Sequence, residues 1–136
     1  MIKNKNQNKA VSIAAETLIQ NKVDDAILID LQQYNTLTYD YLIVCTCQSE
    51  SQMRTILNST HKAMNQNNEQ GSRVEYQPGA KWGLLDCGDL ILHVFEKNAR
   101  NYYALEQLWN DAIITPLKPE DYLIKKEEEI NNDAFL

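Results

Sequence analysis

A strand-length segment of the chain is almost continuously apolar, and this limits the folds that the chain can adopt. Residues 41–46 read Tyr-Leu-Ile-Val-Cys-Thr, with no alternation between apolar and polar side chains. A strand of this kind is typical of a sheet that is flanked by helices and buried on both faces. A second short, largely apolar run at residues 26–31 also predicts a strand. We therefore expect a sheet covered by helices.

Helical periodicity surrounds these two strands. Apolar side chains recur at helical spacing over residues 9–22 and again over residues 53–64. Ser49 is the expected N-cap of the second helix, because Gln52 follows it at the spacing of a capping box. A third helix is predicted from Asn98, ended by Pro116 and Pro119, with one apolar face made of Leu105, Leu108, Trp109, Ala112 and Ile113.

The remaining segments complete an α/β fold. Residues 73–76 fit a short edge strand, and residues 82–86 and 90–96 fit a hairpin with Gly88 in its tight turn. The order α-β-β-α-β-β-β-α predicts a mixed β-sheet flanked by helices. A chain of 136 residues is expected to form a single domain. We assign residues 1–9 to a disordered N-terminus, 10–115 to the domain and 116–136 to a charged C-terminal tail.

The charge distribution argues against direct docking on nucleic acid. The net charge is −6, and residues 10–115 carry seven basic and thirteen acidic side chains. Binding to nucleic acid requires clustered lysines and arginines, and no such cluster is visible in the sequence. An acidic domain is better matched to a basic protein partner.

The sequence predicts a cytoplasmic protein with reduced cysteines. Its apolar runs are far shorter than the roughly 20 residues that a membrane helix needs. The first nine residues lack the apolar stretch of a secretory signal. Three cysteines at irregular spacing form a poor disulfide framework. Cys45 and Cys47 share a face of the predicted strand, and we interpret them as small core residues.

Two clusters are candidates for function, and neither contains a phosphate loop, paired zinc ligands or a nucleophile elbow. In the first, Asp86 and Asp89 flank the hairpin turn and His93 follows. An acid–base or metal site is chemically conceivable there. Alternatively, the aspartates are turn residues and His93 is hydrogen-bonded beside the sheet. A third interpretation is an acidic recognition edge anchored by Trp82.

The second cluster lies on the predicted third helix. Arg100, Tyr103 and Glu106 fall at helical spacing on a side that flanks the apolar stripe. Arg100 can pair with an acid elsewhere, including Asp86 or Asp89. Trp109 is more typical of a core residue, whereas Tyr103 fits either role.

These motifs resemble those of the ribosomal silencing factor family, also called the iojap family, over about residues 10–113. The most specific match is Trp82-x-x-x-Asp86-x-Gly88-Asp89-x-x-x-His93, followed by Arg100-x-x-Tyr103-x-Leu105-Glu106-x-Leu108-Trp109. The chain departs from the usual family pattern at Cys47, Ser51 and Tyr76, where the family usually has glycine, arginine and glycine.

The resemblance implies a nucleotidyltransferase-like fold that lacks the catalytic signature of those enzymes. It implies binding to the large ribosomal subunit through the fourteenth ribosomal protein of that subunit, at the face that meets the small subunit. Occupying that face blocks subunit joining and represses translation. The resemblance also implies a homodimer when the protein is free. We expect no catalysis, no cofactor and no metal.

We hypothesise that the partner-binding surface has an apolar centre and an acidic rim. Its predicted members are Glu75, Trp82, Leu84, Asp86, Asp89, His93, Arg100 and Tyr103. The alternative is a diverged nucleotidyltransferase or metal-dependent hydrolase that uses Asp86, Asp89 and His93. A dimeric scaffold with a non-ribosomal partner is a further possibility.

Overall fold

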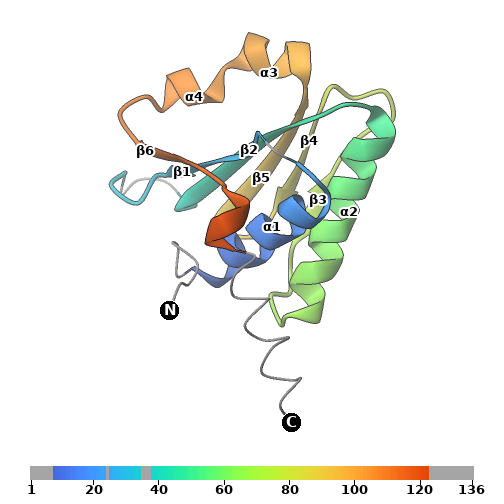
Figure 1. Ribbon diagram of the computed structural model, residues 1–136, viewed down its shortest axis with the longest axis horizontal. Coiled ribbons are helices and arrows are strands. Elements are labelled where there is room, and N and C mark those ends of the chain that lie inside the picture. The colour runs from blue at the N-terminus through green and yellow to red at the C-terminus, as the bar shows by residue number, and fades with distance from the viewer. Residues whose placement is uncertain (1–7, 24, 35–37, 123–136) are drawn as a thin grey trace.

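The computed structural model describes residues 8–23, 25–34 and 38–122. They form one six-stranded sheet with helices on both faces (Figure 1). The strands are β1 (Ile27–Asp30), β2 (Tyr41–Cys47), β3 (Arg73–Glu75), β4 (Trp82–Asp86), β5 (Leu90–Glu96) and β6 (Ile113–Pro116). The helices are α1 (Lys9–Gln20), α2 (Glu50–Gln66), α3 (Lys97–Tyr103), α4 (Leu105–Leu108) and the 3₁₀ turn η1 (Pro119–Asp121).

The sheet is mixed, as the sequence predicts. Its strand order is β3-β4-β5-β2-β1-β6. The central strands β2 and β5 pair in parallel, and every other pair is antiparallel. The predicted hairpin of β4 and β5 and the predicted edge position of β3 are both confirmed. The predicted α/β class, a helix-flanked mixed sheet in a single domain, is therefore confirmed.

Each face of the sheet has its own core. On one face α1 and α2 pack against β2 and β5, and Cys45 and Cys47 both point into this layer. On the other face a smaller cluster, which includes Leu42, Val44 and Phe95, lies beneath the segment that contains α3 and α4. The apolar run of β2 is thus buried on both sides, which is why it shows no alternation.

The start of α2 confirms the predicted cap. The Ser49 hydroxyl accepts a hydrogen bond of 3.0 Å from the Gln52 amide. The Gln52 side chain accepts in turn from the amide of Gln48, one residue before the cap. The cap thereby satisfies a donor that the first turn of a helix otherwise leaves unpaired.

The prediction of one helix over residues 98–113 is wrong. The backbone of Ala104 has φ +46° and ψ +54°, and this left-handed residue separates α3 from α4. Glu96, rather than Asn98, caps α3 by accepting a hydrogen bond of 3.1 Å from the Ala99 amide. Ile113 belongs to β6, which pairs with β1. A β-branched run suits an extended strand better than a helix.

The packed part of the chain extends beyond the boundary expected at residue 115. Leu117 and Tyr122 are both buried in the same core cluster as the inner face of α1. At the other end, Asn8 caps α1 and Lys9 begins it, whereas residues 1–7 and 123–136 lie outside the described residues. None of the helices in the described part of the chain is long and apolar enough to cross a membrane.

Candidate partner-binding site

The strand register brings most of the predicted site residues to one face of the sheet. Trp82, Leu84 and Asp86 alternate along β4 and therefore point the same way. Across the hairpin, His93 lies opposite Leu84. On the edge strand, Glu75 lies opposite Leu84 from the other side. This is the face that α3 and α4 cover only in part.

The centre of this face is a cluster of aromatic rings. The Trp82 ring lies 4.8 Å from the Phe95 ring and 4.8 Å from the Tyr103 ring, centroid to centroid. Phe95 is buried and Trp82 is half-buried, while Tyr103, at the end of α3, is 48% exposed. We call Trp82, Leu84, His93, Phe95 and Tyr103 the aromatic face. Its outer rings present apolar surface held in a fixed arrangement.

His93 is hydrogen-bonded within this face. The indole Nε1–H of Trp82 donates to Nδ1 of His93 at 3.0 Å, which places the imidazole proton on Nε2. Burial lowers the pKa of His93 to about 4, so the ring is neutral at pH 7. Of the interpretations that the sequence left open, the structure supports a histidine satisfied beside the sheet.

The acidic residues sit at the edge of the aromatic face. Asp86 accepts a hydrogen bond of 3.0 Å from the Gly88 amide, which makes it a turn residue. Arg73 lies 3.9 Å from the Asp86 carboxylate and 4.0 Å from the Glu75 carboxylate, and its side chain is 72% exposed. Asp89 is exposed in the hairpin turn. The rim is therefore acidic, and Arg73 partly offsets its negative charge.

A groove of about 510 Å³ runs beside the aromatic face. Its lining includes Glu75, Trp82 and Leu84, together with Tyr76 on the chain that follows β3. Three of the predicted contact residues thus share one concave surface at the sheet edge.

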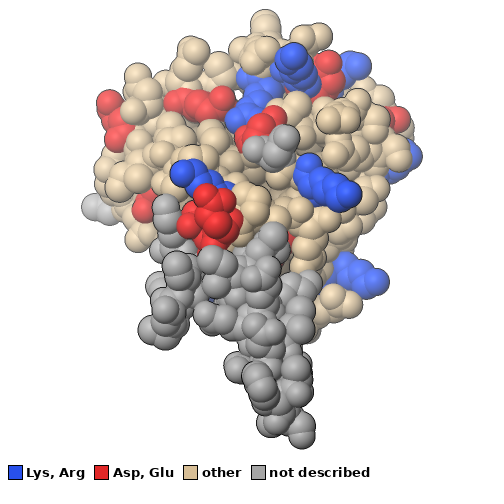
Figure 2. Space-filling view, viewed as in Figure 1, with Lys and Arg blue, Asp and Glu red and all other residues tan. Residues whose placement is uncertain are grey.

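In the view of Figure 2, acidic and basic side chains are interspersed rather than gathered into one basic patch.

The alternative of a metal-dependent enzyme that uses Asp86, Asp89 and His93 has no support in the described residues. Over residues 8–122 as described, no group of three or more His, Cys, Asp or Glu side chains is arranged to hold a metal ion. The Asp86 carboxylate is already engaged by the turn amide, and the Nδ1 atom of His93 is engaged by Trp82.

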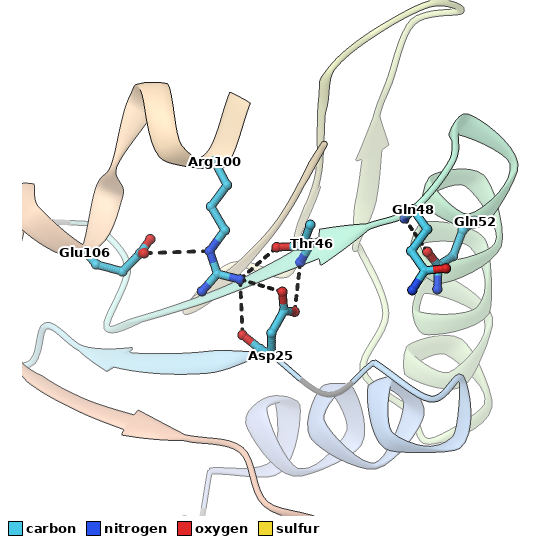
Figure 3. Close-up of polar contacts among 6 residues, drawn as sticks. All are labelled: Asp25, Thr46, Gln48, Gln52, Arg100 and Glu106. Atoms are coloured by element: carbon cyan, nitrogen blue, oxygen red, sulfur yellow. Dashed lines mark hydrogen bonds and ion pairs between the residues drawn. The ribbon is translucent and has the colours of Figure 1, made fainter. Parts of the chain in front are cut away.

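Arg100 pairs with acidic side chains elsewhere in the chain, as expected, but these are Asp25 and Glu106 rather than Asp86 or Asp89. Its guanidinium lies 3.1 Å from the Asp25 carboxylate and donates to the Thr46 hydroxyl at 2.9 Å (Figure 3). Its Nε also lies 3.6 Å from the Glu106 carboxylate. The Arg100 side chain is only 14% exposed and faces away from solvent. Sequence reasoning missed Asp25 and Thr46, because their link to residue 100 is created only by the fold.

Comparison with known proteins identifies the family. Residues 4–134 match the family model described as ribosomal silencing factor during starvation. The chain is 33% identical over 112 residues to ribosomal silencing factor RsfS of Bacillus subtilis. The aligned region covers 82% of this chain and 94% of that protein. The chain belongs to the ribosomal silencing factor family, as the sequence resemblance indicates.

Solved structures agree with this assignment. A crystal structure of a Chromobacterium violaceum protein is similar with a TM-score of 0.67 at 30% identity, covering 75% of this chain and 84% of that one. A crystal structure of a Bacillus halodurans protein is similar with a TM-score of 0.65 at 29% identity. The match covers 76% of this chain and 95% of that one. Family membership supports a ribosome-associated silencing role, and the family name describes a regulatory factor rather than an enzyme.

Proposed function

We propose that this protein binds the large ribosomal subunit through the fourteenth ribosomal protein of that subunit and blocks joining of the small subunit. Membership of the ribosomal silencing factor family supports a ribosomal partner. The observation that carries the choice of surface is the Trp82–Tyr103 pair, two aromatic rings 4.8 Å apart on a sheet face that the helices leave partly open. The proposed place of action is the cytoplasm, and free protein is proposed to form a homodimer.

The chemistry of this surface suits a basic protein partner. Exposed aromatic side chains held in place by their neighbours contribute much of the binding energy in protein interfaces. Tyr103 supplies such an anchor, and the half-buried Trp82 and Leu84 add apolar area beside it. Glu75, opposite Leu84 on the edge strand, and Asp89, in the β4–β5 turn, are both exposed and favour a partner that presents lysine and arginine.

Silencing by this route needs no chemical step. A standard protein interface buries about 800 Å² on each partner, which is enough to hold a small folded domain firmly in place. A domain fixed at the face that meets the small subunit then excludes that subunit by its volume. Repression of translation follows from the reduced number of assembled ribosomes.

Two truncations test the aromatic anchors. Trp82→Ala and Tyr103→Ala should each weaken binding to purified large subunits by roughly 2 kcal/mol, as interface aromatics do. Tyr103→Ala is the sharper variant, because it leaves the Trp82–His93 hydrogen bond in place. Thermal unfolding establishes that each variant is folded. Wild-type affinity in a folded Tyr103→Ala protein would contradict the proposed surface.

A charge reversal tests the acidic rim. Glu75→Lys should slow association with the large subunit and reduce the dependence of the association rate on salt. Glu120→Lys is the matched control, because Glu120 is exposed on η1, outside the aromatic face and its rim. Equal effects of the two reversals would indicate a response to net charge alone and would contradict a local role of Glu75.

A further inference from the structure

The short helix α3 contacts the sheet through Ala99 and the Tyr103 ring. No residue of α3 or α4 is fully buried, and α3 has only seven residues. A helix of this length is not stable by its own hydrogen bonds. Its position must therefore be set by specific contacts with the body of the protein. This matters because α3 ends at Tyr103, the most exposed ring of the aromatic face.

Arg100 supplies such a contact. Its Nη1 lies 3.1 Å from the Asp25 carboxylate, and it donates to the Asp25 carbonyl at 3.1 Å and to the Thr46 hydroxyl at 2.9 Å. The Asp25 carboxylate also accepts a hydrogen bond of 3.1 Å from the Thr46 amide. The two residues that receive the Arg100 guanidinium are therefore held to each other. Figure 3 shows the guanidinium reaching from α3 to the end of β2 and the segment before β1. A planar guanidinium held from several sides leaves its helix little freedom to rotate.

The same helix turn connects this anchor to the aromatic face. Tyr103 lies three residues after Arg100, so the two side chains leave α3 from the same side. Tyr103 contacts Trp82 with ring centroids 4.8 Å apart and Phe95 with centroids 6.0 Å apart. A small rotation of α3 would move the Tyr103 ring off Trp82. The guanidinium anchor therefore sets the outer shape of the surface.

We infer that Arg100 is a positioning residue for partner binding, acting through α3 and Tyr103 rather than by touching the partner. This inference rests on the proposed function and deepens it. Asp25 becomes part of the binding machinery although it belongs to the segment before β1, outside the aromatic face. The guanidinium is occupied by this chain's own acceptors and is 14% exposed, which leaves it little surface to offer a partner.

A double-mutant cycle on the affinity for purified large subunits tests the inference. Arg100→Lys keeps the charge but loses the planar donor group, and it should weaken binding about tenfold. Asp25→Asn should produce a similar loss. Once Tyr103 is replaced by alanine, neither change should weaken binding much further, because their effect passes through Tyr103. Fully additive losses would overturn the inference, since they indicate that Arg100 contacts the partner directly.

A spectroscopic measurement on the free protein separates this inference from the proposed function. The Trp82 indole lies beside the Tyr103 ring, so its N–H resonance in an NMR spectrum depends on where that ring sits. This resonance should shift in Arg100→Lys and in Asp25→Asn. Arg54→Lys, on exposed α2 surface, is the matched control and should leave the resonance in place. An unmoved Trp82 resonance in both anchor variants would overturn the positioning role. If the wild-type protein fails to bind large subunits, the proposed function fails, but this measurement still decides whether Arg100 orients the face.

Discussion

The indole of Trp82 donates its hydrogen bond to Nδ1 of His93 across the β4–β5 hairpin, at 3.0 Å. The two residues come from neighbouring strands, two positions apart in register, and both rings stand on the same face of the sheet. The bond fixes the indole plane and satisfies a largely buried imidazole at once. It links the stability of the hairpin to the geometry of the proposed partner surface.

This relationship predicts a pH-dependent stability. Burial holds the pKa of His93 at about 4 in the folded protein, below the usual value of 6.5. The unfolded chain therefore gains a proton at a higher pH than the folded chain does, and stability falls as the pH decreases from about 6.5 to 4. Between pH 7 and pH 5 the free energy of unfolding should fall by about 2 kcal/mol from this group. Urea unfolding of the wild type and of His93→Gln measures it. An equal loss in both proteins would contradict the assignment.

Removing the donor should destabilise the hairpin. Trp82→Phe keeps a ring against Phe95 but leaves Nδ1 of His93 without its donor, and it should lower the free energy of unfolding by about 1–2 kcal/mol. Trp109→Phe is the matched control, because the Trp109 indole packs edge-on against Tyr34, with ring centroids 5.2 Å apart. Replacing it should not leave a histidine without its hydrogen-bond donor. Denaturant unfolding compares the two. A larger cost at Trp109 would argue against an energetic role of the hydrogen bond.

The break between α3 and α4 offers a stabilising substitution. Ala104 has a φ of +46°, in the left-handed region. A residue with a Cβ atom is destabilised there by roughly 1–2 kcal/mol, whereas glycine is not. Because glycine avoids this cost but gives the unfolded chain more freedom, Ala104→Gly should raise the free energy of unfolding by about 0.5–1 kcal/mol. Chemical denaturation measures the change. A loss of stability would show that residue 104 does not adopt this backbone conformation in solution.

The packing of α2 on β4 leaves no room at Gly83. A Cβ atom there would lie 2.8 Å from Cδ1 of Leu57 and 3.1 Å from Sδ of Met53. Gly83→Ala should destabilise the protein by about 1–2 kcal/mol, because overpacking forces these side chains to move. Leu57→Val in the same chain should relieve part of the cost, giving a less than additive double variant in denaturant unfolding. Strict additivity would indicate that the helix does not crowd this position.

The sequence predicted the fold wherever one pattern acted alone. The uninterrupted apolar run of β2 required burial on both faces, and Ser49 with Gln52 marked the start of α2. It failed over residues 98–113, where two patterns competed. The spacing from Leu105 to Trp109 suggested that the helix continues through Ile113, yet the β-branched residues Ile113 and Ile114 pair with β1. A left-handed alanine at residue 104 leaves no sign in the sequence.

The candidate site was predictable along the hairpin and unpredictable across the fold. Alternation on β4 places Trp82, Leu84 and Asp86 on one face, and the tight turn sets the register with His93. The partners of Arg100 could not be read in this way. Asp25 lies 75 residues earlier in the chain and meets Arg100 only because β1 and β5 both flank β2.

Gradient sedimentation of the protein mixed with separated ribosomal subunits tests silencing by occlusion. The protein should migrate with the large subunit alone, and excess protein should reduce the peak of assembled ribosomes. Tyr103→Ala should restore that peak at equal concentration. Migration with neither subunit, or with assembled ribosomes at undiminished yield, would contradict silencing by occlusion.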